Sequence, residues 1–145
     1  MKMTHADITR YRKFAYYVRH DIPEIIHVRS IVAAMQEIGQ LDRASLQRAV
    51  RWNQGPDIKI TPLADAYGEF TPDIGSNEIR IDKSVVEDFE AGRGVRQTSS
   101  GRNVYLAGVT LLHELVHWGD DKDGIDRPGE EGAEFERRVY GMIID

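Results

Sequence analysis

The first 55 residues carry apolar side chains at helical spacing. Apolar positions recur every three to four residues in 7–20 and again in 23–38, which predicts two helices. Asp42 is a favourable N-cap residue, so a third helix is expected from there to about Trp52. Turn-forming residues follow at 53–56. The N-terminal part of the chain is therefore predicted to be helical.

The middle of the chain changes to an alternating pattern. Residues 58–60, 66–70 and 78–81 alternate apolar and polar side chains, with turn-forming residues between them. This pattern predicts a small, mostly antiparallel sheet of about three short strands. A short helix is expected at 83–91. Residues 92–103 show no periodicity and are rich in small and polar residues, which predicts an exposed, mobile loop.

Helical spacing returns in the last third. Asn103 is suited to cap a helix that runs to about Trp118 and ends at Gly119. A second helix is expected to begin near Pro128 and to reach at least Met142. Helices, then a sheet, then helices indicate an α+β fold. With 145 residues, the chain is predicted to form one domain, in which residues 1–55 are the helical N-terminal part and residues 56–145 hold the sheet and the last helices.

Composition excludes several classes of function. The net charge of −5 argues against a nucleic-acid partner, because phosphate binding needs a basic surface. The absence of cysteine excludes disulfides, thiolate metal sites and cysteine nucleophiles. No apolar run is long enough to predict a membrane span, and the N-terminus lacks the apolar stretch of a signal peptide. The expected location is the cytosol of the producing cell, or delivery by a secretion system that reads no such signal.

Candidate chemistry lies on the helix predicted at 104–118. That helix is apolar on nearly every face, which is typical of a core helix. His113 and His117 are one turn apart, so their imidazoles project from one side with Cβ atoms about 6 Å apart. Two neutral imidazoles in this arrangement can hold a divalent cation, and zinc favours nitrogen ligands. A polar cluster satisfied within the core is the alternative interpretation.

Glu114 lies about 100° around the same helix from His113. It can border a metal site without binding the metal, and there it can act as a general base toward a metal-activated water. It can then pass the proton to the leaving amine. One spacing thus supplies two ligands and a base, which is the mechanistic content of HExxH.

A catalytic zinc ion needs a third protein ligand and an open position for water. Glu130, at the start of the final helix, is the preferred third ligand, and Glu131 is the near alternative because sequence does not determine helix phase to one residue. Glu134, one turn beyond Glu130, is expected to orient a ligand histidine. Asp123, six residues after His117, is a second placement for the ligand. Acidic residues at a helix start can also be explained by the helix dipole alone.

The segment HELVHWGD followed by EEGAEFE resembles the zincin metallopeptidases of the gluzincin arrangement. More narrowly, residues 57–145 are similar to the metallopeptidase toxin domains of bacterial polymorphic toxins and secretion-system effectors. The resemblance implies one catalytic Zn²⁺ held by His113, His117 and Glu130, with Glu114 as the base. It also implies a protein or peptide substrate bound along a sheet edge, for which residues 78–82, with Ile79, Arg80 and Ile81, are the candidate strand. A toxin further implies a cognate immunity protein.

The function predicted from sequence is therefore a zinc-dependent endopeptidase that acts as a bacterial toxin or effector. The alternative is a regulatory or sensing protein whose zincin-like domain acts through a partner. The N-terminal helices would be suited to bind that partner. A degenerate zincin that binds metal without chemistry is a third hypothesis. The intact Glu114 counts against it, because a pure binding site needs no base there.

Overall fold

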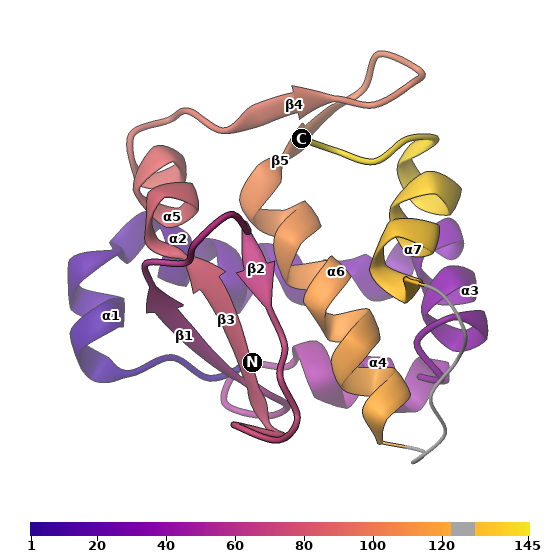
Figure 1. Cartoon of the computed structure of the whole chain (residues 1–145), viewed down its shortest axis with the longest axis horizontal. Helices are drawn as coiled ribbons and strands as arrows, with labels where there is room; N and C mark the ends of the chain where they lie inside the picture. Colours follow the sequence, from indigo (N-terminus) through magenta and orange to yellow (C-terminus); the bar gives the residue numbers. More distant parts are fainter. Residues whose placement is uncertain (123–129) are drawn as a thin grey trace.

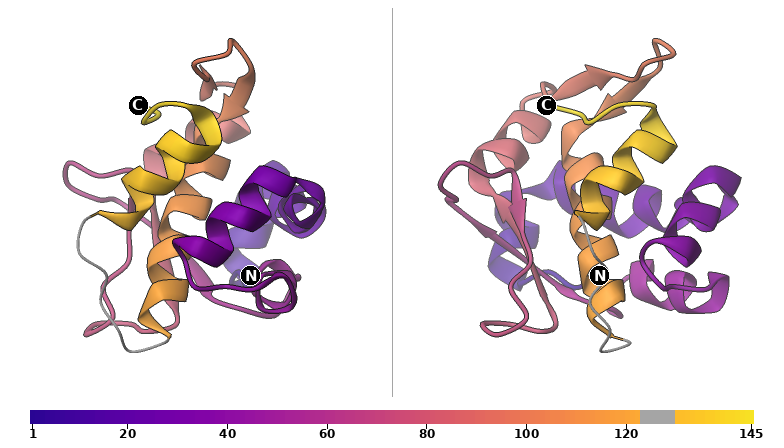
Figure 2. Two further views of the ribbon diagram at one scale, coloured as in Figure 1. Left: turned by 90° about the vertical axis from the view of Figure 1, so that its right-hand side faces the viewer. Right: turned by 45° about the vertical axis from the view of Figure 1, so that its right-hand side comes forward.

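The computed structural model describes residues 1–122 and 130–145. Among these residues, no helix is both long enough and apolar enough to cross a membrane. The small three-stranded sheet lies at one side of the molecule with helices packed against it, and one long helix lies between the sheet and the last helix (Figures 1 and 2). This arrangement is α+β, as the sequence predicts.

The N-terminal half is helical, but in shorter pieces than the periodicity predicts. Its elements are α1 (His5–Arg10), α2 (Arg12–Tyr16), a π-helix η1 (Tyr17–Asp21), a 3₁₀-helix η2 (Ile22–His27), α3 (Arg29–Glu37) and α4 (Arg43–Val50). The helix predicted at 7–20 is interrupted at Tyr11, whose φ of −118° and ψ of 65° are not helical. The helix predicted from residue 23 starts as the 3₁₀ turn and becomes α-helical only at Arg29. The side chain of Asp42 caps α4, as predicted.

The three strands are β1 (Asp57–Thr61), β2 (Gly68–Glu69) and β3 (Glu78–Asp82), in the spatial order β1-β3-β2. β3 pairs with β2 antiparallel, but its longest pairing, with β1, is parallel. The prediction of mostly antiparallel pairing is wrong for this pair. Residues 62–77 separate the two strands, and that connection is long enough for the crossover that parallel strands require. Ile79 and Ile81 on β3 face the core and are fully buried.

The segment 92–103 is not the loop that its composition suggests. After α5 (Lys83–Glu90), strands β4 (Val95–Gln97) and β5 (Asn103–Tyr105) form an antiparallel hairpin. The turn is closed by the main-chain N–H of Thr98, which donates to the carbonyl of Arg102 at 2.8 Å. Asn103 therefore belongs to a strand and does not cap a helix. Three-residue strands are too short to produce a visible alternation.

The long central helix is α6 (Leu106–Asp121), and the last helix is α7 (Glu131–Tyr140). α6 extends past the predicted end at Gly119, and α7 ends before the predicted Met142 because Gly141 adopts a left-handed φ of +77°. The predicted start at Pro128 lies outside the described residues. Both helices share one core with the N-terminal helices and the sheet. Its largest fully buried side chains include Phe14, Met35, Leu46, Ile79, Leu111, Leu115 and Phe135.

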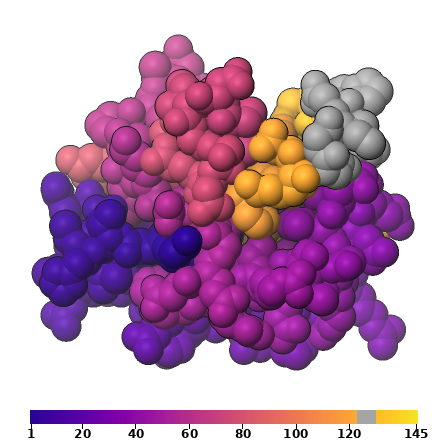
Figure 3. Space-filling model, turned by 90° about the horizontal axis from the view of Figure 1, so that it is seen from below, coloured from indigo at the N-terminus to yellow at the C-terminus, as the bar shows by residue number. Residues whose placement is uncertain are grey.

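The C-terminal end of α6 reaches the surface beside the residues that precede β3 (Figure 3). The indole N–H of Trp118 donates to Asn77 Oδ1 at 3.1 Å, and Lys122 Nζ donates to the carbonyl of Ser76 at 2.9 Å. These contacts attach the end of α6 to the sheet side of the molecule. α7 packs against the opposite side of α6 and also contacts α3. α6 therefore contacts the sheet side of the molecule on one face and α7 on the other.

Candidate metal centre

His113 and His117 project from one face of α6, with their ring centroids 5.2 Å apart. Their neighbours in the helix are almost all buried, including Leu111, Leu112, Leu115 and Val116. Within residues 111–117, His113 and His117 are the side chains that reach solvent, with 22% and 25% of their side-chain surfaces exposed. The helix period thus places the two rings side by side at the border of the core.

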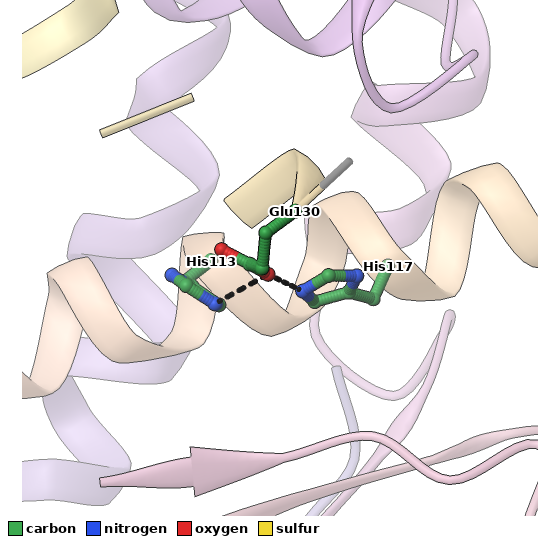
Figure 4. Close-up of side chains that lie close together, drawn as sticks. All are labelled: His113, His117 and Glu130. Atoms are coloured by element: carbon green, nitrogen blue, oxygen red, sulfur yellow. Dashed lines mark ion pairs between the residues drawn. The ribbon is translucent and has the colours of Figure 1, made fainter. Parts of the chain in front are cut away.

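Glu130 joins the two rings from the start of α7 (Figure 4). Its Oε1 lies 2.6 Å from His117 Nε2 and 3.4 Å from His113 Nε2. Its other oxygen accepts the main-chain N–H of Ala133 at 2.5 Å, so Glu130 is the N-cap of α7 and not a residue of its first turn. The cap geometry therefore determines where the Glu130 carboxylate lies.

The remaining nitrogen of each ring faces a buried carboxylate on α7. Glu136 Oε1 lies 2.6 Å from His113 Nδ1, and Glu131 Oε2 lies 3.3 Å from His117 Nδ1. Glu131, the alternative ligand, is thus on the side of the ring away from Glu130. Glu134, which the sequence predicts to orient a ligand histidine, is exposed on the same helix, and its role stays a prediction. Both rings therefore turn Nε2 toward Glu130 and Nδ1 toward a carboxylate.

Glu136 was missed by sequence reasoning, although a signal for it exists. Gly132, Phe135, Glu136 and Val139 follow the i, i+3, i+4, i+7 spacing of one helix face. The structure places this face against α6, and Glu136 is only 4% exposed. A carboxylate inside an otherwise apolar stripe indicates a buried partner, because an unpaired buried charge is costly. The sequence does not reveal that the partner is His113.

Glu114 lies on the face of α6 that is turned toward the sheet. It is 6% exposed, and its Oε1 is 3.9 Å from His113 Nε2. Burial, together with the charges of Glu130, Glu69 and Glu136, raises the pKa of Glu114 to about 7, against the opposing effect of His113. The main chain of Gly68 in β2 packs against the Glu114 side chain. Glu114 therefore lies between His113 and β2.

The two histidines and the carboxylates around them shift one another's pKa values. Burial lowers the pKa of His113, but the hydrogen bond to Glu136 and the charges of Glu114, Glu130 and Glu136 outweigh burial, so the net shift is upward. For Glu130, burial raises the pKa, and the hydrogen bond from Ala133 together with the two histidines lowers it more. The carboxylates thus favour a positive charge at the rings, which a proton or a metal cation can supply.

The residues fit a metal ion. Single ligand atoms of His113, His117 and Glu130 all lie within 4.8 Å of one another, so this group could hold a metal. Two ligands about 2.1 Å from a tetrahedral ion are about 3.4 Å apart. The His113–Glu130 separation has this value, whereas the 2.6 Å between His117 and Glu130 is the distance of a direct hydrogen bond, which a metal ion would have to widen. Glu131 Oε1 is buried, and no residue that the structure describes forms a hydrogen bond with it. A cation at the rings would offset this concentration of buried carboxylates. Asp123, the second placement for a ligand, lies outside the described residues.

A cavity of about 220 Å³ lies beside His113 and Glu114. Its lining is mixed, with Ala66, Tyr67 and Gly68 on the sheet side, Val109 and Thr110 on α6, and residues 143–145 on the third side. The strand that borders this cavity is β2. The prediction that Ile79, Arg80 and Ile81 form a sheet edge is wrong, because β3 lies between β1 and β2. Strand order depends on long-range pairing, which the alternation in the sequence does not encode.

Comparison with known proteins places these features in a family. The family model for metallopeptidase toxin 3 matches residues 7–141 of the chain. No curated protein matches the sequence, and no solved structure matches the fold.

Proposed function

This chain belongs to the metallopeptidase toxin 3 family, and we propose that it is a zinc-dependent endopeptidase that acts as a bacterial toxin. In this proposal His113, His117 and Glu130 hold a single zinc ion. One observation carries it: both imidazoles turn Nε2 toward a shared carboxylate oxygen while a buried carboxylate lies at each Nδ1. Carboxylates at Nδ1 favour the tautomer in which Nε2 carries the lone pair that binds a metal.

A bound zinc ion would polarise the peptide carbonyl and lower the pKa of a bound water toward about 7. The chain's own residues do the rest. Glu114 stands beside His113 on the side that opens to the cavity, where it can accept a proton from the attacking water. The same carboxyl group can then donate that proton to the leaving amine. The contact with Gly68 limits the movement of the Glu114 side chain between the two transfers.

The substrate is proposed to be a protein segment in an extended conformation. β2 is short and borders the cavity beside Glu114. Within the part of the chain that the structure describes, its side away from β3 pairs with no strand, so it can pair with a peptide main chain. Ala66, Val109, Ile143 and Ile144 supply apolar lining next to the reacting groups, which suits an apolar substrate side chain.

The toxin role carries two further proposals. A cell that makes a peptidase toxin needs protection, so we propose a cognate immunity protein that binds this chain. Delivery by a secretion system is proposed as the route to the target cell. Both follow from family membership and not from a surface of the structure.

The test combines zinc binding with growth. The wild type and Glu114→Gln are expressed in a bacterium, directed either to the cytosol or to the periplasm, and the purified proteins are assayed for zinc and for cleavage of a denatured protein. The wild type is expected to bind one equivalent of zinc and to stop growth in one compartment. Glu114→Gln should keep the zinc, lose about 10²–10⁴-fold in cleavage rate and permit growth.

The other outcomes separate the alternatives. Equal toxicity of the two proteins would exclude peptide hydrolysis as the cause. A wild type that binds zinc but neither cleaves protein nor stops growth would favour the regulatory alternative. A wild type without stoichiometric zinc would overturn the proposed metal centre itself.

A further inference from the structure

Residues 141–145 fold back toward the candidate metal centre. The left-handed Gly141 ends α7, and the segment returns toward the N-terminal end of α6 (Figure 1). Ile144 is 4% exposed, and residues 143–145 form one side of the cavity next to His113 and Glu114. The segment is therefore part of the wall of the site, although it is remote in sequence from the HExxH helix.

Glu136 connects this segment to His113. One oxygen of its carboxylate lies 2.6 Å from His113 Nδ1, and the other accepts the main-chain N–H of Ile144 at 2.7 Å. Both contacts are sheltered, because Glu136 is 4% exposed. A carboxylate that is bound at both oxygens cannot turn without losing one contact. The orientation of the Glu136 group thus depends on where the Ile144 amide lies.

The segment is held from its outer side by the β4–β5 hairpin. The main-chain N–H and the hydroxyl of Ser99 both donate to the carbonyl of Tyr140 at 3.2 Å. Arg96 Nε donates to the main-chain oxygen of Asp145 at 2.6 Å. These bonds fix the two ends of the segment, so the Ile144 amide between them has a defined position. Hydrogen bonds therefore run from the hairpin through the segment and Glu136 to the His113 ring.

We propose that Glu136 is a positioning residue for His113, and that its action requires the main-chain N–H of Ile144. This proposal rests on the proposed function, in which His113 binds zinc through Nε2. Residues 141–145 then contribute to the metal centre, because the Ile144 amide holds the carboxylate that orients the His113 ring. Loss of such a support typically lowers metal affinity by about 10–100-fold.

The proposal also links the metal to the cavity. Residues 143–145 line the space in which the substrate is proposed to lie. A cavity occupant that moves Ile144 away from Glu136 would loosen His113, and thermodynamic reciprocity requires that zinc then weakens the binding of that occupant. An occupant that leaves the segment in place and does not contact the metal would bind equally well with and without zinc.

A matched pair of substitutions tests the hydrogen bond separately from packing. Ile144→Ala removes most of the side chain but keeps the main-chain N–H, whereas Ile144→Pro removes the N–H as well. Zinc affinity is measured on the full chain by competition with a chelating dye, and the visible spectrum of the Co²⁺-loaded protein reports coordination geometry. Ile144→Pro is expected to bind zinc 10–100-fold more weakly than Ile144→Ala and to show an altered Co²⁺ spectrum.

Glu136→Gln provides a second route that leaves the segment unchanged. A Gln side chain has one acceptor oxygen for two donors, so zinc affinity should fall and the Co²⁺ spectrum should change in the same direction. Equal zinc affinity of Ile144→Pro and Ile144→Ala, or wild-type affinity and spectrum in Glu136→Gln, would overturn the proposal. These outcomes differ from failure of the proposed function, in which the wild type itself holds no zinc.

Discussion

The main chain of Gly132, in the first turn of α7, lies directly against the imidazole of His113. A Cβ atom built at Gly132 would overlap Nε2, Cδ2 and Cε1 of that ring. The close approach of the two helices at this point is what brings Glu130, Glu131 and Glu136 within reach of the histidines on α6. The absence of a side chain at residue 132 is therefore a geometric requirement of the candidate metal centre.

Gly132→Ala is expected to lower zinc affinity and cleavage rate by at least about tenfold, comparable to the loss of a supporting contact. Alanine favours a helix by about 1 kcal/mol over glycine, so the local effect on α7 is stabilising and the loss must come from displacement of the His113 ring. Zinc competition and peptide cleavage are the measurements. Arg137→Ala, on the exposed side of the same helix, is the control and should change neither. Wild-type zinc affinity in Gly132→Ala would contradict the prediction.

Glu130→Ser separates the two roles of Glu130. Serine is a good N-cap, so it can accept a main-chain N–H in the first turn of α7 and preserve the start of the helix. It cannot supply the carboxylate oxygen that lies between the two rings. We expect thermal stability of the metal-free protein to be nearly unchanged while zinc affinity falls by at least about a hundredfold, because a ligand and not a supporting contact is lost. Tight zinc binding by this variant would direct attention to Asp123 as the third ligand.

Gly119→Ala should destabilise the fold without changing the residues of the candidate metal centre. A Cβ at Gly119 would overlap the carbonyl oxygen of Gly39 and would lie 2.7 Å from the side chain of Leu41. Overpacking of this kind costs about 1–3 kcal/mol, and a backbone carbonyl has little freedom to move away. Denaturant unfolding of the metal-free protein measures the loss. Asp121→Ala, at the exposed end of α6, is the control. Equal stability of the two variants would show that α6 and residues 39–41 leave room for an added methyl group.

Asp82→Asn should make the free energy of unfolding depend less steeply on pH below about pH 4. Burial raises the pKa of Asp82, but hydrogen bonds from Ser84 and from the main-chain N–H of Leu63 lower it more, so the net shift is downward. A carboxyl group with a lowered pKa in the folded state contributes stability above about pH 4, and this contribution is lost as the pH falls through the folded pKa.

The free energy of unfolding of the wild type should therefore fall more steeply below pH 4 than that of Asp82→Asn. Denaturant titrations between pH 2.5 and 6 would measure the difference, at roughly half-unit steps around the reference pKa of Asp. Asp73→Asn, in an exposed turn, should keep the wild-type slope. If the free energy of unfolding of Asp82→Asn fell as steeply below pH 4 as that of the wild type, the Leu63 and Ser84 contacts would not depend on the charge of Asp82.

Several features of this protein follow from local sequence alone. The apolar residues of 104–118 require a buried helix, and a period of 3.6 residues places His113 and His117 on one side of it. Glu114, one residue from His113, must then lie around the helix from that pair. The short helix after β3 and the cap at Asp42 are equally local. Each depends on residues within one or two turns of one another.

The tertiary structure decided the remainder, because those features depend on contacts between distant segments. The rotation of α7 about its axis brings Glu136 and Glu131 to the Nδ1 atoms of His113 and His117, and a shift of one residue in that rotation is a turn of about 100°. The order β1-β3-β2 makes β2 the strand beside Glu114, since pairing partners are chosen by the whole sheet. The Ile144 amide donates to Glu136 in a segment whose two ends are bound by residues of the distant hairpin. Sequence periodicity determines which face a side chain occupies on its own helix or strand, and packing determines what that face meets.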